Sequence, residues 1–164
     1  MNREDFPMLK KDIVYLDNSA TTFKPKVLCE SLNDYYMNYT ANAHRGDYDI
    51  SLKVDMMYEQ TRNKVKDFIN AKKREEIVFT SGTTDSLNKI IFGYFKHYLN
   101  EGDEIILNKS EHASNILPWF ELANEMNLII KYAELDDNYN LTLDSIKRSI
   151  TDKTKVCNII TFAY

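Results

Sequence analysis

Short apolar runs and longer amphipathic stretches follow one another through the second half of the chain. The apolar runs have the length and composition of strands, and we predict strands at residues 76–80, 104–107, 128–133 and 155–161. Between them, apolar residues recur at helical spacing, which predicts helices at residues 83–99, 114–126 and 142–150. Strands that alternate with helices in this way predict βαβ units. We therefore expect an α/β fold with a mostly parallel sheet and helices on both faces.

The first half of the chain has a different pattern, with two helices separated by polar loops. Pro25 suits the first turn of a helix that runs to about Tyr39, and Ser51 is the expected cap of a longer helix. The apolar stripe of this longer helix comprises Leu52, Met56, Tyr58, Val65, Phe68 and Ile69. We therefore divide the chain into a loop-rich N-terminal segment, residues 1–50, and an α/β domain, residues 51–164.

The composition argues against several classes of function. Charges of both signs are mixed along the 164 residues and the net charge is −4, which offers no basic face for nucleic acid. No apolar run approaches the roughly 20 residues of a membrane span, so we expect no membrane partner. Cys29 and Cys157 fit neither a disulfide framework nor a metal site. We expect both to be small core residues, no bound metal, and a reducing cytoplasm as the compartment.

Ser81-Gly82-Thr83-Thr84 precedes a predicted helix and has the character of a phosphate cradle. Gly82 lets the backbone approach a ligand closely. Thr83 and Thr84 add hydroxyl donors at a helix N-terminus, where the helix dipole favours an anion. The alternative is a helix cap in which Ser81 or Thr83 satisfies the first-turn N–H groups. Taken alone, so short a motif favours the cap.

His112 lies one βα unit later, between a predicted strand and a predicted helix. Open α/β sheets bind ligands at the carboxyl ends of their strands. An imidazole there can stack on an aromatic cofactor or move a proton near neutral pH. The alternative is a surface or capping histidine. If the two preceding strands are neighbours, both loops meet at one edge of the sheet, which suggests a phosphorylated aromatic cofactor. Asn115 either contributes to that edge or caps the helix.

Two polar loops in the first half carry weaker signals. Arg45, between His44 and Gly46, is suited to holding a carboxylate or phosphate through two hydrogen bonds, although a solvated turn explains the segment equally well. The segment around Asn18 is by default an exposed turn, because small and hydroxyl side chains follow an Asx residue.

Four segments together resemble the group II cysteine desulfurases, which are class V, fold-type I enzymes that use pyridoxal 5′-phosphate. The segments are Tyr15–Thr22 (YLDNSATT), Ala43–Gly46 (AHRG), Phe79–Thr84 (FTSGTT) and Glu111–Trp119 (EHASNILPW). They occur in the family's order, and the resemblance covers essentially the whole chain. It implies a large domain of the kind found in transferases that depend on pyridoxal phosphate, of which residues 51–164 are an incomplete part.

The resemblance also implies a role for each candidate residue. His112 matches the histidine that stacks on the pyridine ring and assists proton transfer. The phosphate of the cofactor is matched by Gly82, Thr83 and Thr84. A loop that folds over the substrate is matched by Asn18, Ser19 and Ala20. His44 and Arg45 match a substrate-side loop near the mouth of the active site, often close to the dimer interface.

The family places four groups beyond the position of Tyr164: the aspartate that pairs with the pyridine nitrogen, the Schiff-base lysine, the persulfide-forming cysteine and the arginine that binds the substrate carboxylate. We therefore interpret the chain as the N-terminal part of a cysteine desulfurase that converts L-cysteine to L-alanine and an enzyme-bound persulfide for iron–sulfur cluster assembly or other sulfur transfer. These 164 residues alone are expected to be inactive. The resemblance implies a homodimer and a sulfur-acceptor protein. Two alternatives stay open: a selenocysteine lyase or another class V enzyme, and a truncated, non-catalytic binding module.

Overall fold

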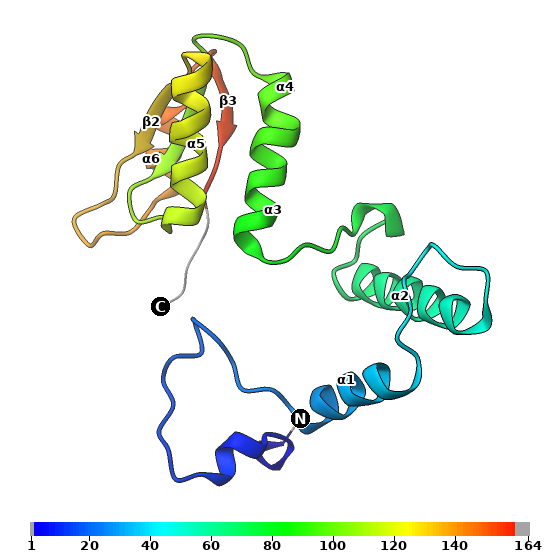
Figure 1. Cartoon of the computed structure of the whole chain (residues 1–164). Coiled ribbons are helices and arrows are strands. Elements are labelled where there is room, and N and C mark those ends of the chain that lie inside the picture. The colour runs from blue at the N-terminus through cyan, green and yellow to red at the C-terminus, as the bar shows by residue number, and fades with distance from the viewer. Residues whose placement is uncertain (1, 160–164) are drawn as a thin grey trace. The chain divides into compact units, whose positions relative to one another are not determined.

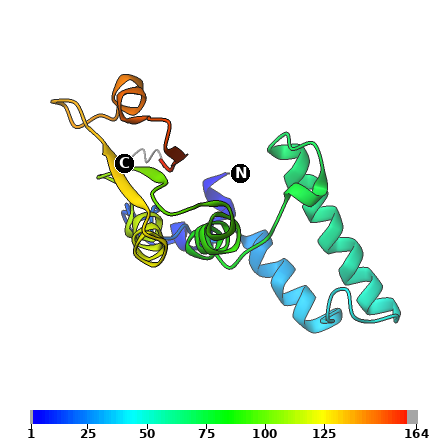
Figure 2. The ribbon, with the colours of Figure 1, turned by 90° about the horizontal axis from the view of Figure 1, so that it is seen from above.

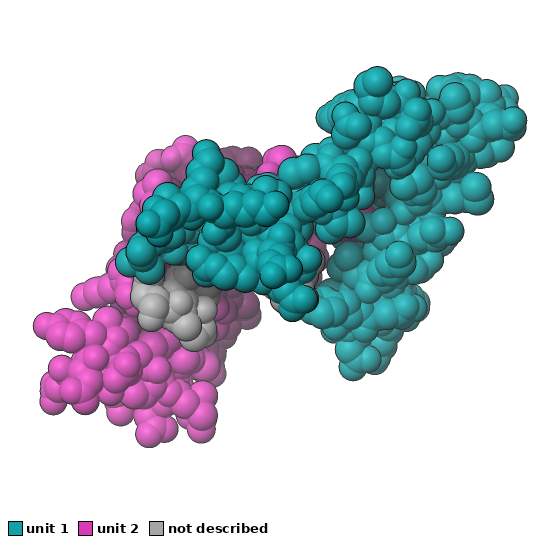
Figure 3. All heavy atoms as spheres, turned by 90° about the horizontal axis from the view of Figure 1, so that it is seen from below, with its two compact units in different colours: residues 1–78 teal, residues 79–164 magenta. Residues whose placement is uncertain are grey.

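The computed structural model of the chain describes residues 2–159 (Figure 1). Contacts divide the chain into two compact units, Met1–Val78 and Phe79–Tyr164, which Figure 3 shows in different colours. The functional division at residue 50 stays a prediction.

The first unit contains two α-helices joined by loops and short 3₁₀ turns. The helices are α1 (Lys26–Asn38) and α2 (Asp49–Phe68), and the 3₁₀ turns are Arg3–Asp5, Pro7–Lys10 and Arg74–Glu76. The predicted helix is present as α1, but Pro25 is its N-cap, with an extended backbone (φ −67°, ψ 152°), rather than part of its first turn. The predicted apolar stripe of α2 is largely exposed: Met56 is 59% and Phe68 is 90% accessible.

The predicted cap of α2 is wrong. The helix begins at Asp49 with Tyr48 as its N-cap, and Ser51 lies fully buried in the first turn. The Ser51 hydroxyl donates a hydrogen bond to the carbonyl oxygen of Asn42 at 3.1 Å. A contact across nine residues thus takes the hydroxyl that local sequence assigned to capping.

The second unit is an α/β sandwich built on three parallel strands, as the alternating pattern predicted. The strands are β1 (Glu104–Asn108), β2 (Ile129–Ala133) and β3 (Thr154–Cys157). Their order is β2-β1-β3, so β1 is the central strand and pairs with both others. Because β1 is covered on both faces, Ile105, Ile106 and Leu107 are completely buried.

The helices of the second unit lie close to their predicted bounds. One long helix consists of α3 (Thr83–Ile90), a π turn (Ile91–Phe95) and α4 (Lys96–Tyr98), and is followed along the chain by α5 (Ala113–Met126) and α6 (Leu143–Ser149). The helices α3 and α5 pack against each other. Figure 2 shows α5 and α6 on opposite sides of the sheet. The connection from β1 to β2 and the connection from β2 to β3 run in opposite directions across the sheet, so right-handed crossovers place their helices on opposite faces.

The main apolar core of the chain lies between this sheet and α3 and α5. Ile105 and Leu107 project from β1 into it and meet Trp119 and Leu122 of α5. Trp119 is 2% exposed, and its ring centroid lies 5.2 Å from that of Phe95. The site-bearing loops of this unit are therefore carried by a packed scaffold.

Two further sequence predictions are wrong. Residues 77–80 form no strand, because no other strand of the described chain runs beside them and an isolated strand has no hydrogen-bond partner. Cys29 and Cys157 are exposed rather than in the core. In β3, alternation turns Val156 toward the core and leaves Cys157 on the other face of an edge strand. Residues 160–161 of the predicted last strand lie outside the described residues.

Candidate functional site

The strand order places a topological switch point between β1 and β3. The chain moves from β1 to β2 on one side, and then crosses to β3 on the other side of β1. In open α/β sheets, ligands bind in the crevice outside the carboxyl ends of the strands at such a point. Here β1 ends at Asn108 and β3 at Cys157, so the loop that carries His112 leaves the sheet at this position.

His112 is the N-cap of α5, and its ring orientation is set by the helix that it begins. Its Nδ1 atom accepts a hydrogen bond from the backbone N–H of Ser114 at 3.2 Å and lies 2.7 Å from the Ser114 hydroxyl. Because Nδ1 accepts, the neutral ring carries its proton on Nε2. The side chain is exposed. The capping role therefore leaves the His112 side chain exposed, as a ligand-facing position would require.

A buried polar link fixes the loop around His112 to the neighbouring strand. The side chain of Asn115 is fully buried and donates from Nδ2 to the Glu111 carboxylate at 3.0 Å. Its Oδ1 accepts from Nδ2 of Asn158, just beyond β3, at 2.6 Å. Asn115 is thus neither a helix cap nor an accessible ligand group. Sequence reasoning missed Glu111 and Asn158, although an asparagine inside the apolar run at 155–161 was a visible signal.

The Ser81–Thr84 segment forms the uncapped start of α3. Gly82 is the N-cap, with a φ of 154°, and no side chain caps the helix. A Cβ atom built at Gly82 would meet nothing within 4 Å, so open space lies beside the backbone there. Thr83 and Thr84 are exposed, and their hydroxyls have no partner among residues 2–159. The helix start therefore retains the donors that an anion requires.

Asp85 is the one acid in the first turn of α3, and its charge is held by local partners. Its carboxylate accepts from the backbone N–H and the hydroxyl of Ser81, both at 3.1 Å, and pairs with Lys89. The Lys89 hydrogen bond, followed by the Ser81 backbone N–H, lowers the pKa of Asp85. Asp85 thus satisfies the N–H of Ser81 and leaves those of Thr83 and Thr84 without a capping side chain.

The two helix starts lie at the same end of the second unit. In Figure 1, α3 and α5 run side by side with their N-terminal ends toward the same side. The sequence predicts that two neighbouring strands bring the two loops to one edge of the sheet. In the structure, the packing of α3 against α5 brings the two helix starts to the same end instead. That Thr83, Thr84 and His112 serve one ligand stays a prediction.

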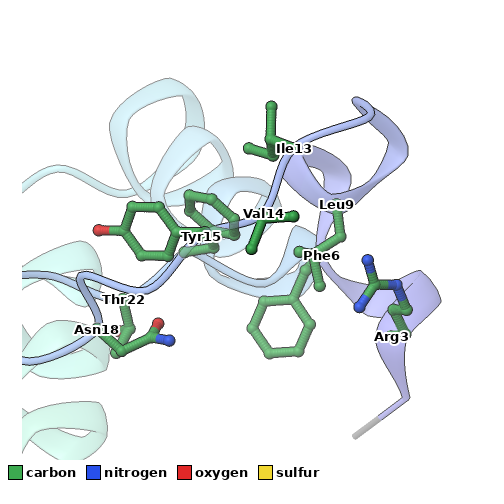
Figure 4. Close-up of a pocket in the computed structure, with 9 residues that line it drawn as sticks. Arg3, Phe6, Leu9, Ile13, Val14, Tyr15, Asn18 and Thr22 are labelled. Carbon is green, nitrogen blue, oxygen red and sulfur yellow. The ribbon is translucent and has the colours of Figure 1, made fainter.

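The first unit contains the other candidate residues. Asn18, Ser19 and Ala20 form an exposed turn, whose neighbour Tyr15 donates its hydroxyl to the carbonyl oxygen of Thr21 at 2.6 Å. Asn18 and Tyr15 border a mostly apolar pocket of about 550 Å³ (Figure 4).

His44 and Arg45 lie in a separate turn of this unit. His44 adopts a left-handed conformation with a φ of 61°, and Arg45 is exposed with no partner in the described part of the chain. That these loops act on the same ligand as His112 stays a prediction.

Residues 2–159 contain no group of three or more histidine, cysteine or acidic side chains arranged to hold a metal ion. No helix within that range is long and apolar enough to cross a membrane. The pKa of the Cys157 thiol is raised by partial burial of the sulfur, which keeps it protonated and weakly nucleophilic.

Comparisons with known proteins agree on one family. The family model described as aminotransferase class-V matches residues 14–162. A probable cysteine desulfurase of Borreliella burgdorferi is 45% identical over 163 residues, which cover 96% of this chain and 39% of that protein. Thus the chain spans about 39% of the length of the curated relatives that it matches.

Solved structures support the same relationship. The apo structure of a cysteine desulfurase from Thermococcus onnurineus matches with a TM-score of 0.87 and 39% identity, over 94% of this chain and 38% of that one. A C-DES mutant with glycine linked covalently to its PLP cofactor shares the fold, with a TM-score of 0.80 at 18% identity over 96% of this chain and 40% of that one.

Proposed function

The chain belongs to the aminotransferase class-V family, and from this premise we propose that it is the N-terminal part of a cysteine desulfurase that depends on pyridoxal 5′-phosphate. The complete enzyme would convert L-cysteine to L-alanine and an enzyme-bound persulfide. The sequence identity of 39–45% to proteins named as cysteine desulfurases supports this assignment.

The uncapped start of α3 is the observation that carries the proposal. Gly82 leaves open space beside the backbone, and the exposed hydroxyls of Thr83 and Thr84 have no partner within residues 2–159. Together with the positive end of the helix dipole, these groups suit a phosphate dianion. Residues 51–164 would then form the incomplete cofactor-binding domain, with Gly82, Thr83 and Thr84 holding the phosphate.

His112 is suited to the ring of the same cofactor. When bound, pyridoxal phosphate supplies an electron sink for the reacting amino acid. The helix cap fixes Nδ1 of His112 and leaves the proton of the neutral ring on Nε2. We therefore assign to His112 the roles of stacking on the pyridine plane and of holding or releasing a proton at Nε2.

The first unit would supply the substrate side of the site. In this proposal, residues 1–50 contribute the Asn18, Ser19 and Ala20 turn, which closes over the substrate. The His44 and Arg45 turn lies on the substrate side near the mouth of the site, and its exposed guanidinium is suited to a carboxylate or a phosphate. Both turns are exposed, as such roles require.

The remaining assignments follow from the same family relationship. We propose a homodimer, a sulfur-acceptor protein as partner, and a role in iron–sulfur cluster assembly in the cytoplasm. Both cysteines are free thiols, which fits a reducing compartment. The 164 residues alone should release no sulfide from L-cysteine, because the family's lysine and nucleophilic cysteine are not among them.

A chimera tests the proposal directly. This chain replaces the matching 39% of the Borreliella burgdorferi relative, and L-alanine formation from L-cysteine is measured with a thiol reductant. We expect turnover, and a loss of about 10²-fold or more in kcat for His112→Ala if the residue moves a proton. Thr84→Val should weaken cofactor binding. Thr61→Val is the matched control, because among residues 2–159 the Thr61 hydroxyl bonds only to the carbonyl of Met57 within α2.

A folded chimera that binds the cofactor but forms no alanine would contradict the desulfurase assignment. The pocket residues that choose the substrate are expected mostly downstream of this chain, so the selenocysteine lyase alternative is tested by comparing turnover of cysteine and selenocysteine with the full protein.

A further inference from the structure

The loop between β1 and α5 begins with a polar turn. Asn108 ends β1 and is 6% exposed, and its Oδ1 accepts a hydrogen bond from the backbone N–H of Ser110 at 3.2 Å. Its carbonyl oxygen accepts from the backbone N–H of Glu111 at 3.3 Å. Because Asn108 belongs to the central strand of the sheet, these bonds define where the loop that carries His112 leaves the sheet.

A side-chain bond closes the start of α5 around His112. The Glu111 carboxylate accepts from Nδ2 of Asn115 at 3.0 Å, and the two residues are 9% and 0% exposed. The backbone N–H of Asn115 also donates to the carbonyl oxygen of His112 at 2.8 Å. The backbone of His112 is therefore held between two buried residues, whereas its own side chain is exposed.

Asn158 attaches this helix start to the neighbouring strand. Its backbone N–H donates to the carbonyl oxygen of Ile106 at 2.9 Å, which continues the pairing of β3 with β1. Its Nδ2 donates to Oδ1 of Asn115 at 2.6 Å. Glu111, Asn115 and Asn158, which we call the polar link, thus connect the His112 loop with the carboxyl end of β3.

The polar link has a fixed direction. A carboxylate only accepts hydrogen bonds, so Asn115 presents its amino group to Glu111 and its carbonyl oxygen to Asn158. Turning the Asn115 amide over would place oxygen against oxygen at Glu111 and nitrogen against nitrogen at Asn158. Because Asn115 is fully buried, solvent would restore neither bond. One orientation of Asn115, and with it one position of the helix start, is therefore favoured.

We propose that Asn115 and Asn158 are positioning residues, which act through Glu111 and the start of α5 to set the His112 imidazole for the cofactor ring before the cofactor binds. This inference rests on the proposed function for the identity of the ring that His112 faces, but not for the arrangement of His112 in the free chain. Preorganisation of this kind removes the cost of ordering the loop when the ligand binds.

The arrangement of His112 can be measured by NMR on the 164-residue chain without cofactor. The nuclear Overhauser effect between Hε1 of His112 and the backbone N–H of Ser114 reports the cap, because Nδ1 of the ring accepts from that N–H at 3.2 Å. Asn158→Asp replaces the donor to Asn115 by an acceptor of the same shape. We expect the Overhauser effect to fall toward about one third, as the His112 side chain divides among three staggered rotamers. A loss of stability alone would not do this, because the molecules that remain folded would keep the cap.

Reversing the direction of the polar link should restore the arrangement. When Glu111→Gln is combined with Asn158→Asp, the amide at residue 111 can donate to Oδ1 of Asn115, and Nδ2 of Asn115 can donate to the carboxylate at residue 158. The double variant should therefore regain the Overhauser effect of the wild type. Asn38→Asp is the matched control, because Asn38 donates to Asp34 over the same four-residue spacing at an exposed position, and it should leave the effect unchanged.

The same variants have a kinetic signature in the chimera. A small displacement of a group at the reacting centre reduces the rate, so Asn158→Asp should lower kcat for L-alanine formation by about tenfold or more, with less than about a twofold change in KM. The double variant should regain most of this loss, and Asn38→Asp should not change kcat.

The possible outcomes separate this inference from the proposed function. If circular dichroism shows that Asn158→Asp is unfolded, Asn158→Ala replaces it, because it removes the donor without adding a charge. An unchanged Overhauser effect in the folded variant would overturn the inference, and so would a double variant that is no better than Asn158→Asp. A loss of the effect with an unchanged kcat would overturn it as well. Failure of the wild-type chimera to form alanine would overturn the proposed function alone, because the Overhauser measurement needs no cofactor.

Discussion

The two units of this chain are stabilised in different ways. The second unit buries a continuous apolar cluster that includes Ile105, Leu107, Trp119 and Leu122. In the described part of the first unit, the buried apolar side chains are Tyr39 and Ile77. Its position-defining contacts are polar, such as those of Asp55 and Glu59 with His44. A sheet offers a broad surface to bury against, whereas two helices and loops leave much of their apolar surface exposed.

This difference suits the proposed division of roles. A packed scaffold holds the helix starts of α3 and α5 at fixed positions, as cofactor binding requires. An exposed turn such as that of Asn18 is easier to move and can respond to a substrate.

The largest contrast is expected between two leucines. Leu107→Ala removes a completely buried side chain and should lower the free energy of unfolding of the second unit by about 2–5 kcal/mol. Leu52→Ala removes a side chain that is 49% exposed and should cost less than about 0.5 kcal/mol. Urea unfolding followed by fluorescence of Trp119, the only tryptophan, and by circular dichroism measures both. Equal losses would show that the burial contrast is wrong.

Two asparagines test the polar contacts in the same way. Asn115→Ala removes a buried bond to the Glu111 carboxylate and should cost about 1–3 kcal/mol, because the acid and Asn158 lose their partner. Asn38→Ala removes a bond to Asp34 with the same four-residue spacing, but exposed, and should cost only about 0.3 kcal/mol. Urea midpoints compare the pair. A cost for Asn38→Ala as large as that for Asn115→Ala would contradict this account.

Replacing a glycine by alanine should lower the stability of the first unit and raise that of the second. Gly46→Ala should destabilise the first unit by about 1–2 kcal/mol, since the new Cβ would lie 2.8 Å from the buried Ser51 side chain. Gly93→Ala has open space and a helical backbone, and should stabilise the second unit by about 0.4–1 kcal/mol. Thermal unfolding of both variants gives the two signs. A neutral Gly46→Ala would show that the turn is loosely held.

The smallest expected effect concerns Glu104 at the start of β1. The Thr151 hydroxyl is the main cause, with Lys131 and Thr154, of the lowered pKa of this carboxyl. Its contribution to stability is therefore present above the unfolded-state pKa of about 4.3 and is lost as the pH falls through the lower folded-state value. The stability difference between the wild type and Glu104→Gln should shrink below that pH. Glu30→Gln, which removes an exposed pair, should show a smaller difference. A constant Glu104→Gln difference down to pH 2 would contradict the sign.

Features encoded by local periodicity were predictable from the sequence. The runs at 104–107 and 128–133 and the helix of Trp119 carry their own pattern, and the structure confirms them. The run at 76–80 has the same pattern, but a strand also needs a partner, which no local signal reports.

Contacts between distant residues escaped prediction for the same reason. Asn115 is held by a residue 43 positions away, and Ser51 by a carbonyl outside its helix. The motifs at Gly82 and His112 were visible because each is defined by its own few residues. The acids that face His44 were not, because neither lies in its motif.

The most direct test of the account is binding of pyridoxamine 5′-phosphate to the isotopically labelled chain, followed by NMR. This probe has no aldehyde to react with surface lysines, and pyridoxamine without phosphate is the control. The account predicts saturable shifts of the Gly82, Thr83 and Thr84 amides and of the His112 ring, with much weaker shifts from the control. Shifts that avoid these residues, or that are equal with and without the phosphate, would contradict the proposed site.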